Sequence, residues 1–293
     1  MGSEMCIRDS IDGAKVIAAL ATNKKPVLKM AGLFKVRTPL LPLYAIPTTA
    51  GTGSEVSVGA VVTDRLARRK LVLADLTLLP KMACLDPEIQ LGVPPAVTAD
   101  TGMDALTHAV EAYLSRNHLP ASDEMALSAV RLIMKNLPKV YADGKDVDAR
   151  QNMALASHYA GIAMSQAGLG YVHAIAHNFG ALYHVPHGRA NAMVLPYVLE
   201  YSKPACIDRL ATLARVSGLD TNGRSNVQLA DDFIDHIRSL NRGFGIPDKL
   251  EALRSTDIPQ ITKAAMKEAR ATYPVPRYMS SNQCSQLVAQ IQA

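Results

Sequence analysis

The chain has 293 residues, 48% of them hydrophobic, and a mean hydropathy of +0.07. A chain of this size and composition can bury a large core, and we expect a soluble protein with two domains. Its formal charge of +5, from 31 Lys and Arg residues against 26 Asp and Glu residues, is spread along the sequence without a basic run. This pattern argues against a nucleic-acid partner.

The sequence also argues against a membrane or an export route. No stretch approaches the roughly 20 consecutive apolar residues of a membrane-spanning helix, and the first ten residues lack the charged start and apolar core of a secretory signal. The cysteines are far apart and form no Cys-x-x-Cys pair, which favours free thiols; they are Cys6, Cys84, Cys206 and Cys284. We therefore expect a cytoplasmic protein without a membrane partner.

The first ninety or so residues predict an α/β layer. Residues 11–21 are typical of a helix capped by Ser10. Its expected apolar face comprises Ala14, Ile17, Ala18 and Ala21. Short β-rich runs bounded by turn residues follow at 42–46, 58–63, 70–73 and 82–85. Because no strand precedes the first helix, we expect the front of the sheet to be absent.

Long helical segments dominate from about residue 94 onward. The expected helices cover residues 98–114, 122–137, 149–166, 172–183, 190–201 and 227–240. The two prolines in residues 92–95 stop the preceding element and direct the chain into the next one, so this segment is the expected linker. The second part is therefore predicted to be all helical.

Two residue pairs have the spacing of neighbours on one helix face. Asp104 and His108 are four residues apart, as are His173 and His177, so each pair can direct two side chains into one cavity. His187, expected in a loop after the second pair, adds a further imidazole.

One carboxylate and three imidazoles suit a borderline divalent metal such as Fe(II) or Zn(II) better than Ca²⁺ or Mg²⁺. Pairing on the helix surface explains Asp104 and His108 alone equally well. The cluster of histidines at 173–187 favours the metal, whereas the isolated ones are interpreted as ordinary residues; they are His118, His158 and His236.

Residues 47–57 form a segment rich in Gly, Ser and Thr after a short β-rich run. Such a loop lets backbone N–H groups and hydroxyls approach a phosphate or ribose. Without other support, an ordinary turn is the better explanation of this segment.

Together these motifs resemble the iron-containing (group III) alcohol dehydrogenases, which have the dehydroquinate-synthase-like fold. The resemblance runs from residue 11 to the C-terminus and is strongest at 47–57, 91–115 and 168–197. It implies that residues 1–92 are the remnant of a Rossmann-like α/β NAD-binding domain and that residues 93–293 are an all-α, metal-binding catalytic domain.

The resemblance also implies the site residues. The metal, Fe(II) or alternatively Zn(II), would be bound by Asp104, His108, His173 and His187. His177 would be a catalytic pocket residue that relays a proton or orients the substrate, with His184 beside it in the pocket wall. NAD(P) would contact Asp12, Lys15, Thr48, Thr49, Ser57 and Lys70.

The implied function is reversible oxidation of a primary alcohol to its aldehyde with NAD(P), by a homo-oligomer when full length. The family's triple-glycine phosphate loop has no counterpart, so we expect an N-terminally truncated member. Three alternatives stay open: a polyol or hydroxy-acid dehydrogenase of the same fold, a metal-binding fragment without catalysis, and a purely structural or assembly role.

Overall fold

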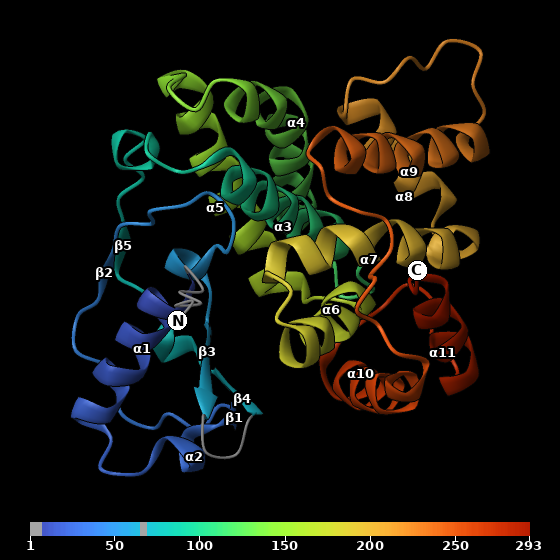
Figure 1. The fold of residues 1–293 in the computed structure, drawn as a ribbon. Helices are drawn as coiled ribbons and strands as arrows, with labels where there is room; N and C mark the ends of the chain where they lie inside the picture. Colours follow the sequence, from blue (N-terminus) through green and yellow to red (C-terminus); the bar gives the residue numbers. More distant parts are fainter. Residues whose placement is uncertain (1–7, 65–68) are drawn as a thin grey trace.

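The computed structural model describes residues 8–64 and 69–293, which form a small α/β layer on one side and a helical body on the other (Figure 1). The layer begins with α1 (Arg8–Thr22). Ser10 lies inside this helix, so the prediction that Ser10 caps it is wrong. Cys6 lies outside the described residues.

The buried face of α1 also differs from the predicted one. Ile17 is 69% exposed and Ala21 is exposed, whereas Asp12 and Lys15 are completely buried together with Val16 and Ala19. The physical reason is that the chain beneath α1 offers polar partners. Lys15 Nζ donates to the carbonyls of Ser57 and Gly59, each at 2.8 Å.

The strands are short and belong to two sheets. In the first, β4 (Arg69–Ala74) pairs in parallel with β1 (Gly32–Leu33) and antiparallel with β3 (Gly59–Asp64). In the second, β2 (Tyr44–Ala45) pairs in parallel with β5 (Met82–Ala83). The four predicted runs are confirmed as strands: β2 and β5 are shorter than predicted, β3 is shifted by one residue, and β4 extends one residue further at each end. β1 was not predicted because two residues give no readable alternation.

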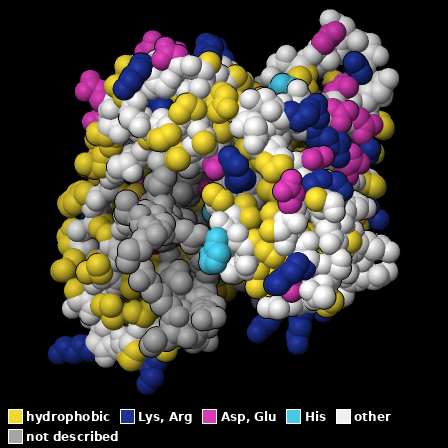
Figure 2. Space-filling model, viewed as in Figure 1, with side chains coloured by type: hydrophobic (Ala, Val, Ile, Leu, Met, Phe, Trp, Pro, Cys, Tyr) yellow, Lys and Arg dark blue, Asp and Glu magenta, His cyan; other side chains and the backbone are white. Residues whose placement is uncertain are grey.

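Short helices complete the layer: α2 (Val27–Met30) and the 3₁₀ turns η1 (Ser54–Val56), η2 (Leu76–Leu78) and η3 (Glu88–Gln90). A small core holds the layer together; it comprises Val16, Ala19, Met30, Val36, Ala60, Leu73 and Leu78. Most of the large apolar side chains that stay exposed lie on this layer, among them Phe34, Tyr44 and Met82. Figure 2 shows hydrophobic side chains spread over this side of the molecule.

The helical body contains the main core. Its helices are α3 (Pro95–Leu114), α4 (Pro120–Ala142), α5 (Val147–Ala167), α6 (Tyr171–Tyr183), α7 (His187–Ser202), α8 (Ile207–Val216), α9 (Asn226–Gly243), α10 (Ile258–Thr272) and α11 (Ser281–Gln290). Two 3₁₀ turns, η4 (Lys203–Ala205) and η5 (Ser255–Asp257), connect them. All six predicted helices are confirmed, whereas α8, α10 and α11 were not predicted.

A proline begins α3, whereas a proline inside α4 does not end that helix. Pro94 precedes α3 and Pro95 opens it, as the predicted linker requires. The predicted end of α4 at Leu137 is wrong, because the helix continues through Pro138. Burial of Leu137 and Val140 in the core offsets the backbone hydrogen bond that Pro138 cannot donate.

α3 is the central helix of the body and packs against α4, α5 and α7. It is buried almost continuously from Thr98 to Leu114, so polar groups on it must find partners inside the protein. In the part of the chain that the structure describes, no helix is long and apolar enough to cross a membrane. The predicted domain boundary between residues 92 and 93 stays a prediction.

Candidate metal centre

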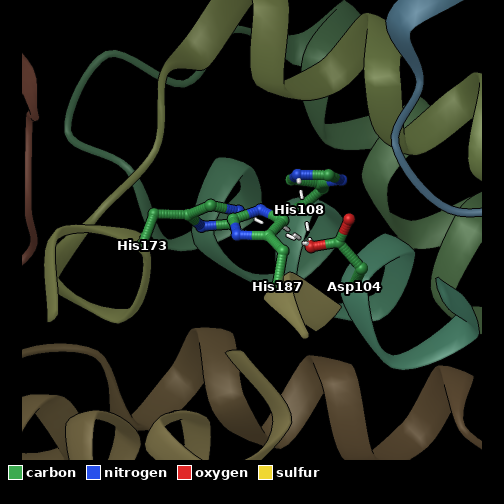
Figure 3. Close-up of side chains that lie close together, drawn as sticks. All are labelled: Asp104, His108, His173 and His187. Atoms are coloured by element: carbon green, nitrogen blue, oxygen red, sulfur yellow. Dashed lines mark ion pairs between the residues drawn. The ribbon is translucent and has the colours of Figure 1, made fainter. Parts of the chain in front are cut away.

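Four side chains from three helices converge inside the helical body (Figure 3). Asp104 and His108 lie one turn apart on α3, His173 lies on α6, and His187 is the first residue of α7. Each offers one ligand atom, and these atoms all lie within 4.8 Å of one another. The prediction that His187 lies in a loop is wrong, because the extended Pro186 leads directly into α7.

The distances in this cluster fit donors arranged around one ion. Asp104 Oδ1 lies 3.4 Å from His187 Nε2 and 3.8 Å from the Nε2 atoms of both His108 and His173. The two 3.8 Å separations are too long for hydrogen bonds. Two ligand atoms that are each about 2.1 Å from a shared metal lie about 3.4 Å apart at a tetrahedral angle. The donor set and its spacing therefore fit Fe(II) or Zn(II).

Hydrogen bonds at the opposite ring nitrogens orient two of the imidazoles. His108 Nδ1 lies 3.3 Å from the carbonyl oxygen of Gly51, and His173 Nδ1 lies 2.6 Å from Glu111 Oε2. An oxygen acceptor at Nδ1 favours the tautomer with its proton there, which leaves the Nε2 lone pair directed toward the cluster.

Glu111 is a residue of the site that the sequence analysis missed. It lies on α3, one turn after His108, and its Oε1 accepts a 2.8 Å hydrogen bond from the amide of Val172. Burial raises the pKa of Glu111 to about 7, although backbone N–H donors such as that of Val172 act in the opposite direction. Asp104, His108 and Glu111 have the spacing of neighbours on one helix face, and this spacing could have indicated Glu111 as a site residue.

His177 lies beside the four-donor cluster and is not part of it. Its ring stacks on that of His187, with centroids 5.3 Å apart and planes at 14°. His177 Nδ1 lies 2.9 Å from Glu268 Oε1, which also accepts a 2.6 Å hydrogen bond from the hydroxyl of Tyr273.

The carboxylate of Glu268 determines which ring nitrogen of His177 carries the proton. Burial raises the pKa of Glu268, but the hydrogen bonds from His177 and Tyr273 outweigh burial, so its pKa lies below the usual value. An ionised carboxylate at Nδ1 of His177 keeps the proton there and leaves Nε2 as the basic nitrogen. The sequence analysis did not predict Glu268, because it lies on α10, a helix that was itself missed.

The loop at residues 47–57 is packed against α3, which carries Asp104 and His108, and against α5. Gly53 adopts a left-handed conformation with φ of 58°, and a Cβ atom there would lie 2.6 Å from Gly161 Cα on α5. Gly51 contributes the carbonyl that faces His108. Thr48 is exposed and Thr49 is buried.

The other predicted cofactor residues are buried, except for one whose side chain is outside the described part of the chain. Asp12 is buried and accepts hydrogen bonds from the hydroxyl of Ser54 at 2.5 Å and the amide of Val61 at 2.8 Å. Lys15 Nζ also lies 3.2 Å from Ser57 Oγ, which is itself buried. The side chain of Lys70 lies outside the described residues. For these residues, and for Thr48 and Thr49, contact with a cofactor stays a prediction.

The isolated histidines lie away from the cluster, as interpreted from the sequence. His118 pairs with Asp123 at 3.1 Å, and His158 with Glu55 at 3.3 Å. Burial lowers the pKa of His236. His184 is exposed and ends α6 in a left-handed conformation, and its place in a pocket wall stays a prediction.

The fold and the site define a protein in which a helical body, joined to a small α/β layer, brings together four donors that could hold a metal ion. Residues 98–292 match the Fe-containing alcohol dehydrogenase family, C-terminal, and residues 9–87 match iron-containing alcohol dehydrogenase. The chain belongs to the iron-containing alcohol dehydrogenase family. This confirms the predicted family and fold and, with them, the enzyme class, a metal-dependent alcohol oxidoreductase.

Individual relatives agree with this assignment. The chain is 40% identical over 281 residues to 1,3-propanediol dehydrogenase of Citrobacter freundii, covering 95% of this chain and 72% of that protein. A crystal structure of 1,3-propanediol oxidoreductase has a TM-score of 0.92 at 38% identity, covering 96% and 74% of the two chains. Sulfoacetaldehyde reductase of Bifidobacterium kashiwanohense, in complex with NAD⁺, has a TM-score of 0.85 at 28% identity, covering 97% and 74%.

Close packing of α7 on α3 sets the distance between His187 and Asp104, which yields a first prediction. A Cβ atom on Gly188 would overlap the carbonyl of Asp100 and lie 3.2 Å from Asp104 Cβ. Gly188→Ala should therefore push the start of α7 away, cost about 1–3 kcal/mol in the free energy of unfolding, and weaken metal binding measured by chelator competition.

The matched control is Gly13→Ala in α1, where an added Cβ meets nothing within 4 Å. This change should leave metal binding unaltered. Equal metal binding by Gly188→Ala and the unaltered protein would contradict the role assigned to this contact.

Proposed function

We propose that the chain transfers hydride between a primary alcohol, or its aldehyde, and NAD(P), with a metal bound by Asp104, His108, His173 and His187. The observation that carries the proposal is the convergence of their ligand atoms within 4.8 Å. We propose Fe(II) as the metal, with Zn(II) as the alternative, because the donors suit both and the family is iron-containing.

The chemistry divides between the bound groups and the protein. When bound, the metal would supply Lewis acidity toward a substrate oxygen, and the nicotinamide would supply or accept the hydride. The chain holds the ligand set rigid through Glu111 and the carbonyl of Gly51, which orient His173 and His108. Burial of the cluster in the helical body keeps bulk water away from it.

We propose that His177 moves the proton. Its ring lies against that of His187, and Glu268 holds the proton on Nδ1, so Nε2 is the nitrogen that can accept a proton from the substrate hydroxyl. His177 is partly exposed, with 28% of its side-chain surface accessible, which gives the accepted proton a route to solvent.

The cofactor side of the proposal rests on the loop at residues 47–57. Gly51 links this loop to His108, so a nucleotide bound there would lie beside the metal centre. Thr48 and Thr49 are the proposed contacts, with Asp12, Lys15, Ser57 and Lys70 supporting or flanking them. A homo-oligomer of cytoplasmic chains, with the domain boundary after residue 92, completes the proposal.

A second candidate function is metal binding without turnover. The observation that favours it is the exposed apolar side chains of the α/β layer, which include Ile17, Phe34 and Met82. Exposed apolar area of this kind marks a surface that is covered in a functional state. A polyol or hydroxy-acid dehydrogenase is a third candidate, since it would keep the metal centre and change only the pocket.

The metal ligands can be tested by His187→Ala. Loss of one of four ligands should leave the helical content unchanged, because His187 stands at the first position of α7, and should sharply lower bound iron measured by elemental analysis. His118→Ala, which removes an exposed histidine paired only with Asp123 in the described contacts, is the control and should keep its iron. Undiminished iron in His187→Ala would sink the assignment.

Substrate class and cofactor binding are tested with the Fe(II)-loaded protein. NADH formation is measured with butanol, 1,3-propanediol, glycerol and 4-hydroxybutyrate, and NADH binding is followed by fluorescence. We expect saturable NADH binding and turnover of a primary alcohol. Turnover of glycerol alone would instead support a polyol dehydrogenase, and absence of saturable NADH binding would support the metal-binding candidate.

A further inference from the structure

Asn191 directs its side-chain amide into the centre of the metal cluster. It lies on α7 one turn beyond His187 and has no exposed surface. Its Nδ2 atom lies 2.7 Å from Asp104 Oδ1, 3.1 Å from His173 Nε2 and 3.3 Å from His187 Nε2. One amide nitrogen is therefore shared by the ligand atoms of three of the four candidate ligands.

The chemistry of this contact is that of a donor among acceptors. A primary amide carries two N–H protons, whereas three electron-rich atoms lie within reach of them. Asn191 Oδ1 is buried on the other side of the amide and has no hydrogen-bond partner among the described residues. The nitrogen end, which carries partial positive charge, thus faces the atoms that a cation would bind.

We propose that Asn191 is a positioning residue of the metal centre, whose amide nitrogen holds Asp104, His173 and His187 in ligand geometry before the metal binds. The inference rests on the proposed metal site and goes beyond it. Asn191 Nδ2 lies among three acceptor atoms, of which Asp104 Oδ1 is 3.4 Å from His187 Nε2 and 3.8 Å from His173 Nε2, so one amide nitrogen bridges the ligand set.

Asp104 can keep its bond to Asn191 when a cation is present. A carboxylate oxygen has two lone pairs, so Oδ1 can serve a metal and the amide together. The imidazole nitrogens have one lone pair each and would exchange the amide for the cation. Asn191 would then fix the direction of the Asp104 carboxylate in both states, in the way that outer hydrogen bonds orient metal ligands in other proteins.

The test is Asn191→Ala with Co(II) as the probe, because its visible absorption reports ligand number and symmetry. We expect Co(II) affinity, measured by chelator competition, to fall about 10- to 100-fold, as is typical when an outer partner of a ligand is lost. We also expect the Co(II) absorption bands to change shape, a readout that loss of stability alone would not alter.

Asn241→Ala is the matched control. Asn241, on α9, is also a buried asparagine whose Oδ1 has no hydrogen-bond partner among the described residues. Its Nδ2 donates a 2.7 Å hydrogen bond to the carbonyl of Ala192, which follows Asn191 on α7. It has no described contact with the candidate ligands. Asn241→Ala should lower stability while leaving Co(II) affinity and absorption as in the unaltered protein.

Asn191→Asp separates the positioning role of Asn191 from its packing, because the side chain keeps its shape while the donor Nδ2 is replaced by a carboxylate oxygen. Two carboxylates would then share a short contact in the metal-free protein, so the metal-free Tm should fall. Co(II) should raise the Tm of this variant by more than it raises that of the unaltered protein, since the cation relieves the repulsion.

The outcomes distinguish this inference from the proposed function. Co(II) affinity of Asn191→Ala within twofold of the unaltered protein, or an equal loss in Asn241→Ala, would overturn the role of Asn191 and leave the metal site standing. Absence of Co(II) binding by the unaltered protein would overturn the proposed metal site itself and this inference with it.

Discussion

Packing of α7 against the buried helix α3, with α6 packed on α7 in turn, is the constraint on which the site is built. α3 carries Asp104, His108 and Glu111 on successive turns, so a single helix face supplies two ligands and the carboxylate that orients a third. Those polar groups are buried at a cost that their mutual contacts must offset. The position of His187 depends on how closely α7 approaches α3, and only glycine at 188 permits the observed approach.

α3 also connects the α/β layer to the cluster of candidate metal ligands. His108 faces the carbonyl of Gly51, and Gly53 packs against Gly161 on α5, so the Gly- and Thr-rich loop cannot move without disturbing the helical body. Beneath α1, the ammonium of Lys15 binds the end of this loop at Ser57, and the carboxylate of Asp12 binds the amide of Val61 in the segment that follows. Buried polar contacts therefore set the distance between the loop and the cluster.

The convergence of the four candidate donors could be predicted from their spacing together with a family resemblance, and their binding of a metal stays a prediction. Asp104 and His108 lie on one helix, and His173 and His187 lie on two consecutive helices. The motifs that flank them resemble a known family. Glu111 shares the α3 spacing and was overlooked because carboxylates are common on helix surfaces. Glu268 and Asn191 could not be inferred this way, since each acts only through the packing of one helix against another.

The errors in the fold have the same origin. The predicted apolar face of α1 followed periodicity, whereas the structure buries Asp12 and Lys15, because backbone partners across the layer outweigh apolar burial there. α4 continues past Pro138 since core contacts of Leu137 and Val140 compensate for one absent donor. In each case, tertiary contacts between distant residues overrode a local pattern.

The central claim is that one carboxylate and three imidazoles of a single chain bind one metal ion. Iron stoichiometry combined with Fe K-edge X-ray absorption of the Fe(II)-loaded protein tests it most directly. The account predicts about one iron per chain, surrounded by nitrogen and oxygen atoms with the scattering pattern of several imidazoles and no sulfur. Iron that fails to bind stoichiometrically, or that shows sulfur ligands, would contradict it.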